Sequence, residues 1–192
     1  MSTAVRPSPR RRLLDTAHRL FYARGIHESG IDRLIAESDV AKATFYKHFP
    51  SKDDLIAAYL DERSERMQAR AVAELPGRSD DPIEQVLCVF DLLAENFGSP
   101  TYRGCAFINA AGECPSVPAV LDAVTRRRRS LKDLFAGLLD RAGLRDTDDL
   151  VAQLCLIYDG AAVSAQLKDA EGPQVHRWAR SAAAAVLASR LS

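Results

Sequence analysis

Two short helices joined by a tight turn are predicted by the stretch Gly30-Ile-Asp-Arg-Leu-Ile-Ala-Glu-Ser-Asp-Val-Ala-Lys-Ala-Thr-Phe-Tyr-Lys-His-Phe-Pro-Ser-Lys-Asp-Asp-Leu55. The expected turn is Ser38-Asp39-Val40, and residues 41–48 form the second helix. That helix carries Phe45 and Phe49 on one side. The other side carries polar, cationic and hydroxyl groups: Lys42, Thr44, Tyr46, Lys47 and His48. Such a face suits the phosphates and base edges of a DNA major groove. The stretch therefore predicts a helix-turn-helix DNA-binding domain.

The residues before this stretch also follow a helical pattern. Apolar side chains that recur from Leu13 to Phe21 predict an amphipathic helix over residues 9–24. Ser29 and Asp32 form a capping-box pattern, which predicts that Ser29 starts the next helix. Three consecutive helices are therefore expected between residues 9 and 48.

The pattern stays helical after Pro50. A second capping box, Ser51 with Asp54, predicts a helix that runs to about Glu74. Further helices are expected over residues 82–97, 104–113, 116–142, 148–169 and 174–190. Since no segment has the pattern of a convincing strand, the fold class is predicted to be all-α, with about nine helices.

Charge is divided unevenly along a chain whose formal net charge is +0. Residues 1–52 hold 10 Lys and Arg against 5 Asp and Glu, whereas the other 140 residues hold 16 against 21. A basic head on an acidic body is expected when one end of a chain meets nucleic acid. We therefore expect an N-terminal helix-turn-helix domain over residues 1–52, which begins with a basic arm over residues 1–12. A larger helical domain is expected over residues 53–192.

Several other classes of protein are disfavoured. No uncharged apolar run approaches the ~18–20 residues of a membrane span, and Met1 to Arg12 lacks the apolar core of a secretory signal. The sequence also contains no His/Glu metal-ligand spacing, no nucleophile elbow and no glycine-rich phosphate loop. We therefore expect a cytoplasmic protein with no membrane partner, no metal and no cofactor, and not an enzyme.

The four cysteines are too far apart for a Cys-x-x-Cys zinc or redox motif: Cys88, Cys105, Cys114 and Cys155. Buried thiols in a reducing cytoplasm are the simplest interpretation. The alternative is a thiol-based redox-sensing regulator that responds through Cys105 and Cys114.

Small side chains crowd the last two expected helices. They allow helix axes to approach closely, so two such helices from each subunit could form a four-helix homodimer interface. The candidate interface residues are Gly160, Ala161, Ser164, Ala165, Ala182 and Ala185. The alternative is that the alanines favour helix formation and pack within one chain.

The sequence resembles the tetracycline-repressor-like (TetR/AcrR) family of bacterial transcriptional regulators. The matching residues are Leu20-Phe21, Gly25, Ile35-Ala36 and the run Thr44-Phe45-Tyr46-x-His48-Phe49-x-Ser51-Lys52-x-x-Leu55. They cover residues 13–60. The segment Gly104-Cys105-Ala-Phe-Ile-Asn109-Ala-Ala-Gly-Glu113 also resembles one found in a subgroup of the family.

The resemblance implies a homodimeric repressor that a small-molecule effector releases from a palindromic operator in double-stranded DNA. Lys42, Ala43, Thr44 and Lys47 would face base edges. Phosphate contacts would come from Tyr46, His48 and Lys52. Arg10, Arg11 and Arg12 would form an arm on the DNA backbone or in a minor groove. The alternatives are that His48 packs against its neighbours and that the arginines form a solvated tail.

The resemblance also implies that the larger domain binds the effector. The candidate pocket residues combine aromatic groups with a few polar ones, as pockets tend to: Phe90, Phe97, Tyr102, Cys105, Phe107, Asn109, Arg128 and Tyr158. Each aromatic could equally be an ordinary core residue.

Four consecutive arginines, Arg126 to Arg129, lie within one expected helix. The apolar stripe of that helix passes through Arg127 or Arg128, so one of them must extend to solvent, pair with an acid or face a cavity. A solvated helix is the simple interpretation, and recognition of an anionic effector by Arg128 is the alternative.

Two departures from the family pattern lie beside the turn. Asp39 stands where glycine is usual, although Asp tolerates a left-handed backbone better than most residues do. Ala41 stands where a hydroxyl cap is common, so we expect the following helix to lack a side-chain cap.

Overall fold

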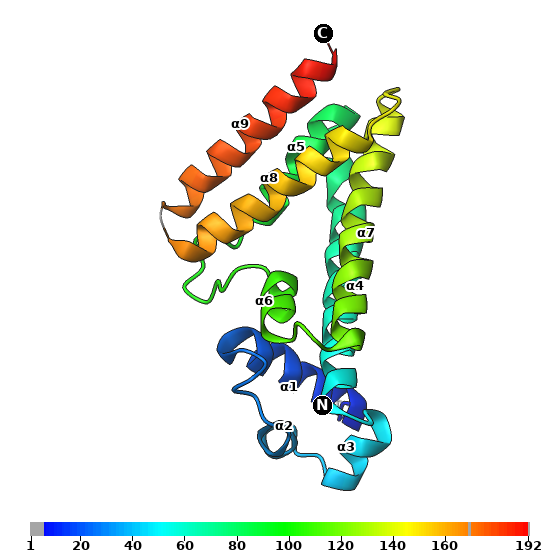
Figure 1. Ribbon diagram of the computed structural model, residues 1–192, viewed down its shortest axis with the longest axis vertical. Helices are drawn as coiled ribbons and strands as arrows, with labels where there is room; N and C mark the ends of the chain where they lie inside the picture. Colours follow the sequence, from blue (N-terminus) through cyan, green and yellow to red (C-terminus); the bar gives the residue numbers. More distant parts are fainter. Residues whose placement is uncertain (1–5, 169, 192) are drawn as a thin grey trace, which may run out of the picture. The chain divides into compact units, whose positions relative to one another are not determined.

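The structure is a computed structural model that describes residues 6–168 and 170–191. Within these ranges it contains nine helices and no strand (Figure 1), so the all-α prediction is confirmed. The helices are α1 (Pro9–Arg24), α2 (Ile31–Ser38), α3 (Lys42–His48), α4 (Lys52–Arg78), α5 (Pro82–Ala94), α6 (Ala106–Glu113), α7 (Pro118–Arg141), α8 (Asp148–Leu167) and α9 (Gly172–Leu191).

The chain forms two compact units. Unit 1 consists of Met1–Arg63 with Ala106–Thr125, and unit 2 of Ser64–Cys105 with Arg126–Ser192. This differs from the expected division at residue 52, because unit 1 also contains α6 and the first turns of α4 and α7. Sequence order hides this arrangement, since α6 begins at Ala106, 58 residues after α3 ends at His48.

In unit 1, apolar side chains of α1 to α4 form one core. Leu13, Leu34, Phe45 and Leu55 are fully buried, and Tyr59 meets the edge of the Phe21 ring at a centroid distance of 5.5 Å. Burial of this kind is the main favourable contribution to folding. It holds α2 and α3 against α1, which fixes the faces they turn outward.

The helix starts in unit 1 follow the predictions only in part. The capping box before α4 is confirmed, because Ser51 Oγ accepts from the Asp54 amide at 3.1 Å. The capping role of Ser29 is wrong: α2 begins after Gly30 without a side-chain cap, and Ser29 Oγ instead donates to the Gly25 carbonyl at 2.7 Å. The predicted end of α4 near Glu74 is also wrong, since the helix continues through Pro76 to Arg78.

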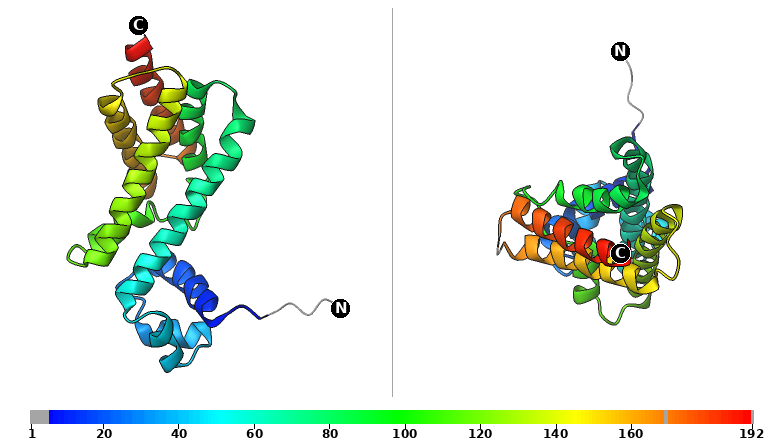
Figure 2. Two further views of the ribbon diagram at one scale, coloured as in Figure 1. Left: turned by 90° about the vertical axis from the view of Figure 1, so that its right-hand side faces the viewer. Right: turned by 90° about the horizontal axis from the view of Figure 1, so that it is seen from above.

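In unit 2, α5, α8 and α9 pack together, and α8 and α9 run side by side in opposite directions (Figures 1 and 2). Phe90 and Phe135 stack at 5.9 Å in the middle of its core. By length and composition, α8 is the one helix in the described ranges that could cross a membrane, but it buries eight residues within this unit. A core helix of a soluble protein passes the same test.

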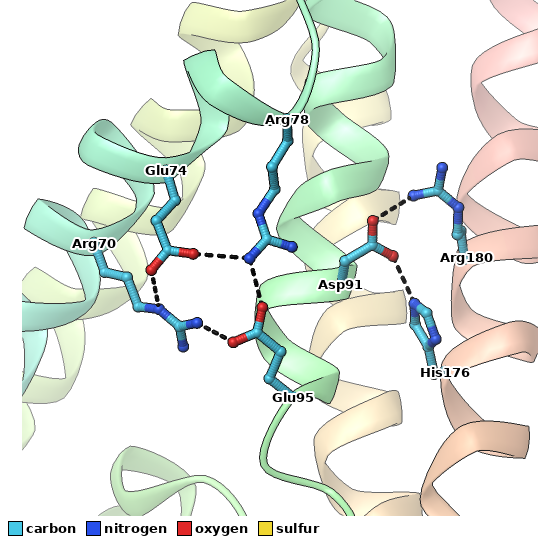
Figure 3. Close-up of polar contacts among 7 residues, drawn as sticks. All are labelled: Arg70, Glu74, Arg78, Asp91, Glu95, His176 and Arg180. Carbon is cyan, nitrogen blue, oxygen red and sulfur yellow. Dashed lines mark hydrogen bonds and ion pairs between the residues drawn. The ribbon is translucent and has the colours of Figure 1, made fainter.

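Two ionic clusters join the helices of unit 2 (Figure 3). In the first, Arg70 and Arg78 each pair with both Glu74 and Glu95, which connects α4 to α5. These arginines lower the pKa of both carboxyl groups by hydrogen bonding. The second connects α5 to α9 through Asp91, which accepts from His176 Nε2 at 2.6 Å and Arg180 Nη1 at 2.9 Å.

Candidate nucleic-acid interface

The α3 helix separates its buried and exposed residues as the sequence predicts. Phe45 and Phe49 are buried, with exposed fractions of 0% and 3%, and their rings lie 6.4 Å apart. The exposed positions are Lys42, Ala43, Tyr46 and Lys47, while Thr44 and His48 lie at the edges of this face and are partly exposed. On this face Lys42 forms a long ion pair of 3.8 Å with Asp32, and both side chains are highly exposed. Such a pair contributes little and is readily exchanged.

The turn before α3 adopts the geometry expected of it. Asp39 is left-handed, with φ 52° and ψ 49°, and its amide hydrogen bonds back to the Ala36 carbonyl at 3.4 Å. Ala41 precedes α3 in an extended conformation and gives no side-chain cap, as predicted. Both departures from the family pattern therefore leave the turn and the helix intact.

The predicted arm is wrong for Arg10, Arg11 and Arg12, because all three lie in the first turns of α1. Arg12 Nη1 donates to the Asp39 carbonyl at 2.6 Å and to the Ser38 carbonyl at 3.1 Å, and it pairs with the Asp39 carboxylate. Arg12 thus stabilises the turn. These hydrogen bonds help to hold the turn with Asp39 in place of glycine, and Asp tolerates the left-handed backbone better than most residues do.

The other two arginines have different environments. Arg11 pairs with Glu62 at 2.8 Å and with Asp15 at 2.7 Å, and the Glu62 hydrogen bond raises the Arg11 pKa. Arg10 remains exposed and lies over the Phe49 ring, 5.5 Å from its centroid. Residues 1–5 of the expected arm lie outside the described residues. Of the three arginines, Arg10 is the exposed one, and its contact with DNA stays a prediction.

Lys52 forms a hydrogen bond within unit 1. Its ammonium group donates to the Ile26 carbonyl at 2.6 Å, and burial lowers the Lys52 pKa. An ammonium group has three donors, so one hydrogen bond leaves capacity for others. The predicted phosphate contact from Lys52 stays a prediction.

The eight candidate pocket residues do not fall in one unit. Phe107 and Asn109 lie on α6 in unit 1, and the other six lie in unit 2. Among those six, Phe90 and Tyr158 pack at 6.1 Å within the core, and the Tyr102 hydroxyl donates to the Ala162 carbonyl at 3.1 Å. These aromatics have core packing roles, which leaves their contact with an effector a prediction.

The structure decides between the two central arginines of α7, which the sequence left open. Arg127 is the buried one, 8% exposed, whereas Arg128 is near the surface and pairs with Asp159. Arg127 lies beside Tyr158, whose pKa is raised by burial, and it acts against that rise. The apolar stripe of the helix therefore passes through Arg127.

The candidate dimer residues divide into exposed and buried ones. Ala161 and Ala165 are each 6% exposed because they pack within unit 2, so their assignment to an interface is corrected. Gly160, Ala182 and Ala185 are exposed, and Ser164 is partly so. The sequence analysis did not identify four exposed large apolar side chains on these two helices: Leu156, Val163, Leu167 and Trp178. All but Val163 are more than half exposed. Their spacing of 7 and 4 along α8 was a signal that could have found them.

The cysteines offer little support for redox sensing. Cys114 is buried, and burial raises its pKa, which disfavours the reactive thiolate. Cys105 is partly exposed but lies in unit 2, whereas Cys114 lies in unit 1. The described residues contain no group of three or more His, Cys, Asp or Glu that could hold a metal ion.

Comparison with known proteins identifies the family. A family model described as bacterial regulatory proteins of the tetR family matches residues 13–59. The curated HTH-type transcriptional regulator YxaF of Bacillus subtilis is 26% identical over 92 residues, and this match spans 48% of each chain, about half the length of that relative.

Solved structures match over nearly the whole chain. A TetR-family transcriptional regulator from Streptomyces coelicolor is 38% identical, with a TM-score of 0.87, and the match covers 97% of this chain and 92% of that one. A TetR-type transcriptional regulator from Streptomyces avermitilis is 31% identical, with a TM-score of 0.78 and coverage of 96% and 98%. Together with the exposed polar face of α3, these likenesses establish that the chain belongs to the TetR family of bacterial DNA-binding transcriptional regulators.

Proposed function

We propose that the protein is a homodimeric transcriptional repressor that binds a palindromic operator and is released from it by a small-molecule effector. The observation that carries the DNA-binding part is the outer face of α3, on which Lys42, Tyr46 and Lys47 are exposed while Phe45 and Phe49 anchor the helix. Base edges would be met by Lys42, Ala43, Thr44 and Lys47, because lysine suits guanine and methyl groups suit thymine.

An apolar stripe along α8 supports the homodimer. Leu156, Gly160, Val163 and Leu167 are exposed and recur at spacings of 4, 3 and 4, which places them on one side of the helix. Trp178, Ala182 and Ala185 form a similar stripe on α9. Exposed apolar stripes of this kind mark protein interfaces. A second copy of the chain could cover both stripes in a four-helix arrangement.

A symmetric dimer would constrain the operator. Two α3 helices would enter successive major grooves about 34–36 Å apart, so the two half-sites should be related by a palindrome. The DNA-binding part is tested by selection from random duplex DNA, followed by footprinting across a salt series. We expect protection of a palindrome with an affinity that falls steeply with salt. Binding without sequence preference would refute a specific regulator.

The dimer is tested by Leu156→Arg, which places a charge in the α8 stripe. We expect monomers by sedimentation and loss of most operator affinity, because one half-site alone binds weakly. Val72→Arg is the matched control, since Val72 is 64% exposed on α4, away from both stripes. A dimeric Leu156→Arg variant with unchanged operator binding would contradict the proposed interface.

The effector part rests on family membership and on the aromatic interior of unit 2. We propose that a small molecule binds there and favours a conformation that binds DNA poorly, because a ligand shifts an equilibrium only through differential affinity for its states. Compounds that raise the melting temperature should be tested for release of the selected operator. A panel of ligands that stabilises the protein yet leaves operator binding unchanged would contradict effector-driven release.

A further inference from the structure

A carboxylate from α6 holds the loop that joins α1 to α2. Glu113 Oε2 accepts from the backbone amide of Ile26 at 2.7 Å and from that of His27 at 2.9 Å. In addition, His27 Nε2 donates to the Glu113 carbonyl at 2.6 Å. All of these residues belong to unit 1. Two successive amides that converge on one anion form a backbone nest, which is an effective site for negative charge.

The loop is shaped for this contact. Gly25 ends α1 with φ 97° and ψ 162°, a conformation open only to glycine, and a Cβ there would lie 3.1 Å from Glu113 Oε2. Lys52 holds the same loop from another side through the Ile26 carbonyl. The amides and the carbonyl of one short loop are thus fixed by side chains from two distant parts of the sequence.

The position of Glu113 in its own helix is otherwise unfavourable. Glu113 is the last residue of α6, where the helix dipole is negative and an acidic side chain is disfavoured. The two charge-assisted hydrogen bonds to the loop offset this cost. Since α2 begins five residues after Ile26, the orientation of that loop decides where α2 and α3 emerge from α1.

We propose that Glu113 is a positioning residue for DNA binding, which acts by fixing the α1–α2 loop so that α3 is presented in its binding orientation. The proposal goes beyond the proposed function, whose DNA contacts lie on α3, and it rests on that function for its DNA readout. It also assigns α6 an indirect part in DNA binding, since α6 acts through the α1–α2 loop and touches no DNA in this scheme.

The sign of the effect separates this role from simple electrostatics. Removal of an acidic charge from a DNA-binding domain should tighten DNA binding if charge alone matters, because repulsion from the phosphates decreases. If Glu113 positions the loop, Glu113→Ala should instead weaken binding to the selected operator by about tenfold, through loss of hydrogen bonds to a charged group. Glu28→Ala is the matched control, since Glu28 is an exposed acid in the same loop.

The test measures operator affinity and amide hydrogen exchange for the wild type and three variants. We expect weak binding and fast exchange at Ile26 and His27 in folded Glu113→Ala, partial rescue by the neutral acceptor of Glu113→Gln, and unchanged or tighter binding by Glu28→Ala. Binding by Glu113→Ala that is equal to or tighter than wild type would overturn the proposal.

Two further outcomes remain decisive. If Glu113→Ala does not fold, Glu113→Gln decides: faster exchange at both amides with unchanged operator affinity would overturn the proposal, and a weaker affinity would support it. If the wild type binds no operator, the proposed function fails, and slow exchange at Ile26 and His27 that Glu113→Ala abolishes would still support the loop-fixing role on its own.

Discussion

Two segments of unit 1, the first turns of α1 and the helix α3, are both rich in basic residues but differ in what those residues contact. Arg11 and Arg12 bind carboxylates and backbone carbonyls of their own unit, whereas Lys42 and Lys47 lie on an exposed face. The count of positive charges is therefore a poor guide to which cations can meet DNA. Availability depends on whether an acceptor lies within reach in the folded chain. Arg11 has such an acceptor at Glu62, and Arg12 has them at Ser38 and Asp39.

The largest effect is expected at the buried anchor of α3. Phe45→Ala removes a fully buried ring and should lower the free energy of unfolding by about 3–5 kcal/mol. Operator binding should be lost together with the fold of unit 1. Chemical denaturation monitored by circular dichroism measures this. A small loss, below about 1 kcal/mol, would mean that α3 is held by something other than the Phe45 packing.

Arg12→Ala should act mainly on stability. The substitution leaves the carbonyls of Ser38 and Asp39 without their charged donor, which we expect to cost about 2 kcal/mol. The slope of log affinity against log salt should stay the same for the folded protein, because Arg12 touches no phosphate in this arrangement. A shallower salt slope with unchanged stability would mean that Arg12 contacts a phosphate, and it would contradict the structural role given to Arg12.

Lys47→Ala should act mainly on binding. We expect operator affinity to fall by about five- to tenfold and the salt slope to become shallower, because one cation is lost from the interface. Since Lys47 is proposed to face base edges, the loss should be largest at sites that carry the matching base. The melting temperature should not change, since Lys47 is exposed. Unchanged affinity and slope would remove Lys47 from the interface.

Arg10→Ala should have the smallest effect. It tests whether Arg10 acts on stability, as Arg12 does, or on DNA binding, as Lys47 does. Its guanidinium stacks on Phe49 at the surface, an interaction worth about 0.5–1 kcal/mol at exposed sites. A loss of this size in stability with no change in salt slope would place Arg10 with Arg12. A shallower slope would place it with Lys47, and the paired measurements distinguish the two results.

The all-helical class, the helix-turn-helix and the two faces of α3 follow from the sequence because they depend on local spacing. A period of 3.6 residues puts Lys47 on the side opposite Phe45 and Phe49 whatever the rest of the chain does. The exposure of Lys42, at the first position of α3, depends instead on the tertiary structure. The left-handed turn at Asp39 and the missing cap at Ala41 are local in the same sense, and both were predicted. Resemblance to the family rests on this same local stretch.

Contacts between residues far apart in sequence were decided only by the tertiary structure. Ser29 has the pattern of a cap yet binds Gly25, Arg127 rather than Arg128 is buried, and Ala161 and Ala165 pack within the chain. Glu113 accepts a hydrogen bond from Ile26, 87 positions away in the sequence, and no local sequence pattern predicts such a pair. Periodicity predicts which side of a helix is apolar, but the partner of a polar or charged group depends on which elements the completed core brings together.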